Sequence, residues 1–210
     1  MARYATSTAM AASLATLPFA SPAYAHHFMG GELPRTGWQG LLAGLGHPII
    51  GIDHFAFIVG AGLLAYLAGR VVLLPLSLVI GTVAGCMLHV MGFDLPAAEL
   101  TVALTVAAAA ALVVTRAKVP LGLLAALVAA AGIYHGYAYG ESIVGAEPMP
   151  LGAYFLGFGI IQSAIGIGSG VALRAGIGRD YLSEATAMRL VGAGLGVVAV
   201  LFLANTALAG

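Results

Sequence analysis

The stretch HPIIGIDH, residues 47–54, sets two imidazoles and a carboxylate at the start of a long hydrophobic segment. Ionisable side chains inside a membrane are costly unless they face a cavity, a partner or a bound ion. Proline is favoured at the first position of a helix, so we predict that a helix begins at Pro48 with His47 as its N-cap residue. His54 then lies about two turns later on the same face as His47, and Asp53 projects to the side.

Imidazole and carboxylate are both ligands of divalent transition metals, so this stretch predicts a metal-ion site. The alternative is a buried, hydrogen-bonded pair of histidines that only holds helices together.

The composition identifies the broad class of protein. Of 210 residues, 61% are hydrophobic and 8% are charged, whereas about a quarter of a soluble domain is charged. Eight basic and eight acidic residues cancel, which leaves no basic field to attract nucleic acid. Thirty glycines suit closely packed membrane helices, either within the chain or between copies in a homo-oligomer. We therefore predict an all-α, polytopic membrane protein embedded in the lipid bilayer.

Residues 1–25 have the pattern of a cleavable secretory signal peptide. Arg3 supplies a positive start, an apolar run follows, and the AYA triplet at 23–25 fits a small-x-small cleavage site. The alternative is an uncleaved amphipathic anchor. Cleavage would leave His26 and His27 at the new amino terminus, where an α-amine and two imidazoles can chelate a cation.

Six hydrophobic stretches follow, each near the roughly 20 residues that a bilayer core requires. We place them at 48–68, 71–92, 96–115, 119–140, 150–173 and 187–208. Residues 26–47 are predicted to form an exported segment with a short interfacial helix, which precedes a six-helix transmembrane domain at 48–210. Basic residues concentrate in alternate loops, and the positive-inside rule then puts both chain ends on the outer side.

This topology places all six histidines of the chain in the outer half of the membrane or on its outer surface. Acidic residues gather on the same side; they are Glu32, Asp94, Glu99, Glu141 and Glu147. Carboxylates concentrate divalent cations and imidazoles select among them, so the pattern predicts a vestibule that collects cations.

A second motif, YHGYAYGE at residues 134–141, lies at the outer end of the fourth predicted span. His135 and Tyr139 are one turn apart and share a helix face. Glu141 lies at the helix end, where its carboxylate can turn back toward an ion. We expect these side chains to join those of the first motif.

The second predicted span contains Cys86 and His89, which are three residues apart and could face one ligand. A sulfur ligand would favour copper(I). The alternative for Cys86 is ordinary apolar packing, and His89 is either a ligand or a partner of one.

Together the two motifs resemble those of the HupE/UreJ family of small bacterial nickel and cobalt permeases. The family's first-helix pattern of a histidine, five residues and Asp-His is matched by His47, Asp53 and His54. Its fourth-helix histidine–glycine–glutamate motif is matched at His135 and Glu141. Tyr139 stands where the family carries a second histidine, which removes one nitrogen ligand. The resemblance covers nearly the whole chain, and it implies a six-helix permease in a bacterial cytoplasmic membrane with both termini in the periplasm.

These observations predict a secondary transporter, and not an enzyme, that moves a divalent transition metal inward. Nickel or cobalt is the expected cargo, copper is the alternative, and no permanently bound cofactor is expected. The chain has no GxxxxGK[ST] loop, so it hydrolyses no nucleotide by that route. The metal-site candidates are His47, Asp53, His54, His135, Glu141 and His89, followed by His26, His27, Asp94, Glu99, Tyr139 and Cys86.

Three alternatives to a nickel or cobalt permease stay open at this point. One is a copper or iron permease of the same plan. The second is a haem-binding electron carrier with His89 and His135 as axial ligands. The third is an accessory subunit that transports nothing and in which a metal only joins helices.

Overall fold

The structure is a computed structural model that describes residues 32–177 and 182–209. Within those ranges the chain forms seven helices and no strand, which confirms the predicted all-α membrane fold. The helices are α3 (Gly37–Ile50), α4 (Ile52–Leu67), α5 (Leu73–Val90), α6 (Ala98–Thr115), α7 (Leu121–Gly140), α8 (Pro148–Ile177) and α9 (Glu184–Ala209). The predicted signal peptide, His26 and His27 lie outside the described residues and stay predictions.

Helices α5 to α9 correspond to five of the six predicted spans, whereas the first predicted span, at 48–68, corresponds only to α4, the second helix of a bent pair. Helices α5 to α9 are each long and apolar enough to cross a membrane, and the bent pair α3–α4 makes a sixth candidate. Prolines mark two helix starts, because Pro120 immediately precedes α7 and Pro148 is the first residue of α8. A missing N–H costs nothing at these positions, where no intrahelical acceptor exists.

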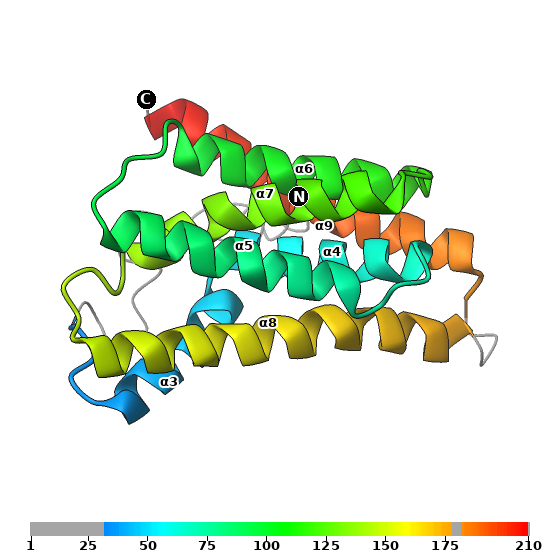
Figure 1. Cartoon of the computed structure of the whole chain (residues 1–210). Helices are drawn as coiled ribbons and strands as arrows, with labels where there is room; N and C mark the ends of the chain where they lie inside the picture. The colour runs from blue at the N-terminus through cyan, green and yellow to red at the C-terminus, as the bar shows by residue number, and fades with distance from the viewer. Residues whose placement is uncertain (1–31, 178–181, 210) are drawn as a thin grey trace, which may run out of the picture.

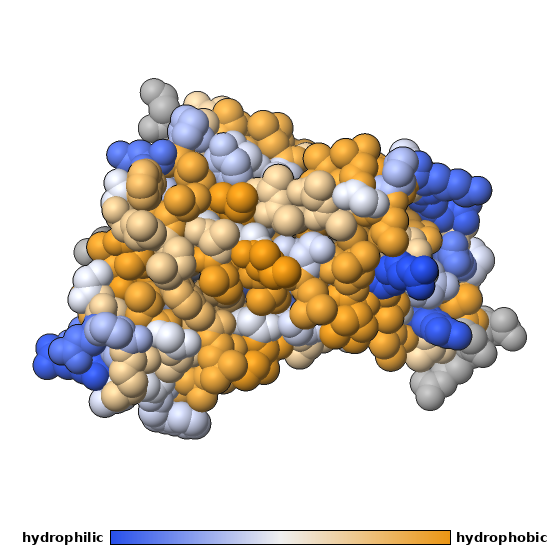
Figure 2. Space-filling model, viewed as in Figure 1, coloured by the Kyte–Doolittle hydropathy of each residue, from blue (hydrophilic) through white to orange (hydrophobic). Residues whose placement is uncertain are grey.

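The long helices run side by side, and the loops lie at the two ends of the bundle (Figure 1). Helix α5 packs on α7, α3 on α8 and α6 on α9, while α4 contacts both α6 and α8. Orange apolar residues dominate the middle of the visible face and blue hydrophilic residues gather at its ends (Figure 2). This distribution is the one that a bilayer requires, because lipid can solvate the apolar middle but not the charged ends.

Charged residues are sorted between the two ends. The end that carries the α4–α5 and α6–α7 loops holds Arg70, Arg116, Lys118, Arg174 and Arg189, together with the acidic residue Glu184. The opposite end holds Glu32, Arg35, Asp94, Glu99, Glu141 and Glu147. We refer to these as the basic end and the acidic end. The basic end is the one that the positive-inside rule assigns to the cytoplasm.

The prediction that a helix begins at Pro48, with His47 as its N-cap residue, is wrong. Helix α3 continues through Pro48 to Ile50, and α4 begins after Gly51 at an angle of 80° to α3. Proline weakens the last turn of α3 because it cannot donate to the carbonyl four residues earlier. The helix is interrupted at Gly51, where the absence of a side chain leaves room for the His54 ring. A Cβ at position 51 would lie 2.6 Å from Cδ2 of His54.

Helix α4 is too short to cross a bilayer alone. Its 16 residues rise about 24 Å, against a hydrocarbon core of roughly 30 Å. Helix α3 packs on α8, and it is longer than the short interfacial helix that we expected, since it includes His47. Its start is fixed by Thr36 and Gln39, whose side chains each accept from the other's backbone N–H.

Glycines allow the helices to approach closely, as the composition predicts. A Cβ on Gly85 of α5 would collide with the backbone of Ile133 on α7. Gly166 of α8 packs against the ring of Pro75, so this close approach also occurs within the chain. By contrast, a Cβ on Gly196 of α9 would meet nothing within 4 Å.

We predict that Gly85→Ala lowers the stability of the folded protein, because the added methyl group must push α5 away from α7. Overpacking of this kind typically costs about 1–3 kcal/mol. The measurement is the thermal unfolding midpoint of the purified protein in detergent. Gly168→Ala is the matched control, because position 168 is also inside a helix but has open space around its Cα. Equal midpoints for the two variants would contradict the close α5–α7 packing.

Candidate functional site

Five of the predicted site residues converge at the acidic end of the bundle. His47 lies in the last turn of α3, Asp53 and His54 lie in the first turn of α4, and His135 and Tyr139 lie near the end of α7. Their exposed fractions are 1% for His47, 6% for Asp53 and 1% for each of the other three. These buried polar side chains, from three helices, form what we call the histidine cluster.

The two histidines of the first motif face each other across the break at Gly51. Their ring centroids are 5.8 Å apart. The expectation that they share one face of a single helix is wrong, because they belong to two helices and the bend brings them together. Tyr139 lies beside both rings, with centroid distances of 4.7 Å to His47 and 4.6 Å to His54. The residue that replaces the family histidine is therefore at the middle of the cluster.

The hydrogen-bond geometry favours one tautomer for each of His54 and His135. The Nδ1 atoms of these histidines are 2.7 Å apart, and Nε2 of His135 is 3.0 Å from the hydroxyl of Thr105. That hydroxyl donates its proton to the Val102 carbonyl, so it accepts from Nε2–H of His135. A neutral His135 then accepts at Nδ1 from Nδ1–H of His54. The lone pair of a neutral His54 is consequently on Nε2.

The same reasoning applies to His47. Its Nδ1 atom is 2.9 Å from the hydroxyl of Tyr154 and 3.1 Å from that of Ser142. Both hydroxyls donate to the backbone carbonyl of Tyr139, at 3.1 Å each. When both hydroxyls donate to this carbonyl, their oxygens accept from Nδ1–H of His47, and this arrangement puts the lone pair of the imidazole on Nε2 as well. Metal-binding histidines commonly have this arrangement, in which the second ring nitrogen donates to a neighbouring oxygen.

Asp53 is placed by the start of α4. One of its oxygens accepts from the backbone N–H of His54 at 2.9 Å. The first N–H groups of a helix have no intrahelical acceptor and carry partial positive charge, so they favour a carboxylate there. The N-cap residue Gly51 provides no side-chain hydrogen bond of its own. Asp53 thus combines a structural role at the helix start with a negative charge in the cluster.

A polar contact between α5 and α8 lies next to the cluster. The Thr82 hydroxyl donates to the amide oxygen of Gln162 at 3.2 Å, and both residues are fully buried. The side chain of Gln162 also interacts with the Tyr139 hydroxyl. The sequence reasoning did not single out Thr105, Ser142 or Tyr154. Their signal is weak, because isolated hydroxyls in apolar helices more commonly bond to their own backbone.

The remaining candidates among the described residues lie outside the histidine cluster. The His89 ring packs on Tyr137, with a centroid distance of 4.2 Å. Glu141, Asp94 and Glu99 are exposed. Cys86 lies in an apolar cluster with Tyr139, Tyr154 and Phe158, which agrees with the packing alternative. Within 32–177 and 182–209, no three His, Cys, Asp or Glu side chains are arranged to hold one metal ion.

We predict that Thr105→Val destabilises the protein and disturbs the tautomer of His135, because the buried Nε2–H loses its acceptor. The cost of a buried unsatisfied donor is about 1–3 kcal/mol, to be measured as a fall in the thermal unfolding midpoint. Thr105→Ser keeps the hydroxyl and should retain the wild-type tautomer. The ¹⁵N spectrum of histidine-labelled protein separates the tautomers directly; an Nδ1–H form of His135 in the wild type would refute the assignment.

The sequence comparisons agree with the motif resemblance. A family model described as "HupE / UreJ protein" matches residues 14–202. Protein HupE of Rhizobium leguminosarum bv. viciae is 33% identical over 188 residues, which cover 87% of this chain and 94% of that protein. No solved structure matches the chain significantly. On the strength of the family match and of this relative, the chain belongs to the HupE/UreJ family.

Proposed function

We propose that this protein is a permease that moves a divalent transition-metal cation inward across the bacterial cytoplasmic membrane. Nickel or cobalt is the proposed cargo, and it binds transiently at the histidine cluster. Membership of a family associated with nickel and cobalt transport supports this function. The observation that carries the proposal is that the His47 and His54 rings lie 5.8 Å apart, with the Nδ1 atom of each ring hydrogen-bonded to a neighbouring side chain.

The spacing of the two rings suits a shared ion. Imidazole nitrogen binds a transition metal at about 2.0–2.1 Å, which puts the ion about 3.2 Å from the ring centroid. Two rings that share an ion at angles from tetrahedral to linear then have centroids about 5–6.5 Å apart. The separation of 5.8 Å between His47 and His54 lies in this range.

Two nitrogen ligands leave room for other donors. Asp53 supplies the buried negative charge that offsets the charge of the cation, and Tyr139, whose ring lies beside both imidazoles, is the candidate for an oxygen donor. The ion keeps part of its water shell, because no third histidine or cysteine joins the pair within 32–177 and 182–209. Such binding is modest in strength, which suits a transporter since a tight site would retain its cargo.

The proposed route leads from the acidic end to the cluster and then along α8. Exposed carboxylates such as Glu141 and Asp94 gather cations at the entrance. Beyond the cluster, the polar side chains of Gln162, Thr82 and Ser169 are buried or half-buried near α8 and offer oxygen donors. The side of α4 that faces α6 and α9 is filled with apolar side chains and offers none. A membrane potential of about 100 mV contributes about 4.6 kcal/mol to the inward movement of a doubly charged ion.

The haem-carrier alternative receives less support. Both ring nitrogens of His135 are hydrogen-bonded, to His54 and Thr105, so neither is directed toward an axial site. His89 instead packs on Tyr137.

We predict that His54→Ala and Asp53→Asn abolish nickel or cobalt uptake while the protein remains abundant in the membrane. The variants remove a nitrogen ligand and the buried negative charge respectively. Uptake is measured with radioactive metal in cells that lack their own nickel importer, and abundance by immunoblot. Glu141→Gln is the matched control. This carboxylate is exposed, so its replacement should reduce uptake only modestly. Full uptake by His54→Ala would overturn the proposed site.

We also predict that Tyr139→His changes the order in which metals compete. It places a third nitrogen beside His47 and His54, and additional nitrogen donors favour later first-row ions such as nickel and copper. The measurement is uptake of labelled cobalt against excess nickel, copper or iron, in wild type and variant. Tyr139→Phe, which removes only the hydroxyl, distinguishes a ligand effect from loss of the oxygen. An unchanged order in Tyr139→His would place the metal away from Tyr139.

A further inference from the structure

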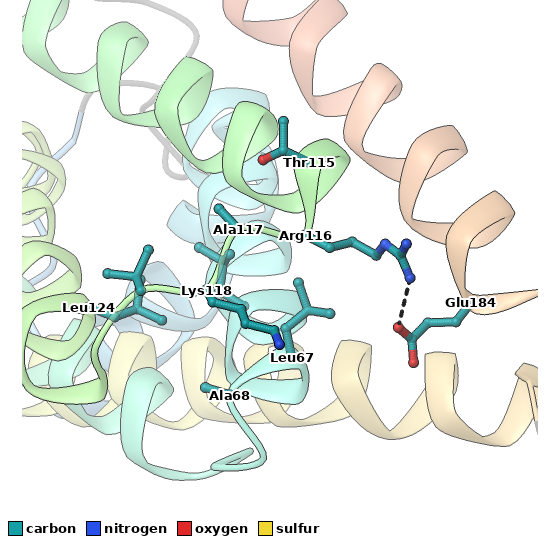
Figure 3. Close-up of a pocket in the computed structure, with 10 residues that line it drawn as sticks. Leu67, Ala68, Thr115, Arg116, Ala117, Lys118, Leu124 and Glu184 are labelled. Atoms are coloured by element: carbon teal, nitrogen blue, oxygen red, sulfur yellow. Dashed lines mark ion pairs between the residues drawn. The ribbon is translucent and has the colours of Figure 1, made fainter.

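A cavity of about 540 Å³ opens at the basic end, away from the histidine cluster (Figure 3). It lies between the end of α4, the α6–α7 connection and the starts of α7 and α9. Its wall has an apolar part, made of Leu64, Leu67 and Leu124, and a charged part, made of Arg116, Lys118 and Glu184. The proposed transport route does not use it.

The charges around the cavity favour an anion. Glu184 already has two partners: Arg116 at 3.6 Å and the hydroxyl of Tyr66, which donates to it at 3.1 Å. Lys118 forms no ion pair within the described part of the chain. The backbone N–H groups at the start of α7 add partial positive charge. The N-cap residue Pro120 makes no side-chain capping bond to them. A cation leaving the protein would be repelled here.

The apolar part of the wall points to an amphiphile. Leu64 and Leu124 are each 4% exposed, and Leu67 is half-buried. The cavity thus joins an apolar surface to a cationic rim at the level where α4 and α6 end and α7 begins. A phospholipid complements this arrangement, because its apolar acyl chains join a charged headgroup at the membrane boundary. Basic pockets between membrane helices on the cytoplasmic side bind anionic headgroups.

We propose that this cavity binds an anionic phospholipid. Lys118 and Arg116 contact the phosphate, and Leu67 and Leu124 contact the beginning of an acyl chain. The Arg116–Glu184 pair can yield to the headgroup, because both side chains are partly exposed, at 47% and 39%, and exposed ion pairs are weak. The bound lipid would connect the ends of α4, α6, α7 and α9, which all contribute to the cavity wall.

The test uses the purified full-length protein in detergent, titrated with phosphatidylglycerol or with zwitterionic phosphatidylcholine. We expect phosphatidylglycerol to raise the thermal unfolding midpoint at lower concentration than phosphatidylcholine. Lys118→Gln should raise the concentration of phosphatidylglycerol needed for half the effect about fivefold, the usual contribution of one basic residue near an anionic lipid. Lys118→Arg keeps the charge and should behave as the wild type does.

Arg70→Gln is the matched control, because Arg70 is an exposed cation at the same end that does not line the cavity. An equal effect of Arg70→Gln and Lys118→Gln would mean that stabilisation by phosphatidylglycerol depends only on the overall charge of this end of the protein. That result would overturn the proposal. Equal stabilisation by the two lipids would overturn it as well. Inorganic phosphate or glycerol 3-phosphate is the third arm, and stabilisation by either at the same concentration as phosphatidylglycerol would assign the cavity to a free anion instead.

Discussion

The break between α3 and α4 is the constraint on which the site depends. Two helix ends meet inside an apolar bundle, where unsatisfied backbone groups are costly because no water is available. Asp53 accepts the N–H of His54, and the N–H of Gly51 returns to the carbonyl of His47. These bonds make an 80° bend tolerable at this depth. The bend in turn directs the two imidazoles toward one point.

The neighbouring helices convert this bend into a defined site. Helix α6 orients His135 through Thr105, and His135 orients His54. Helix α8 orients His47 through Tyr154. Each of these contacts uses a ring nitrogen on the side away from the proposed ion. Transport selectivity would then depend on residues that never touch the cargo, because they decide which nitrogen presents its lone pair.

The two ends of the bundle have opposite electrostatic character, and this gives the molecule a direction. The histidine cluster lies at the acidic end, where carboxylates raise the local concentration of cations. At the basic end, Lys118 and Arg116 line the cavity that we propose for an anionic headgroup. In the orientation that the positive-inside rule assigns, the acidic end would face the incoming cations and the basic end would face anionic headgroups on the cytoplasmic side.

The sequence by itself determined the membrane class, the six apolar segments and the polar residues of two motifs, because bilayer thickness and side-chain hydropathy act on each segment separately. It also indicated that residues 47, 54 and 135 belong together. Only the tertiary structure decided that the chain breaks at Gly51, that Tyr139 lies between the imidazoles, and that Glu141 stays exposed. Helical periodicity specifies which side chains share a face, but which faces meet depends on close packing between segments distant in sequence.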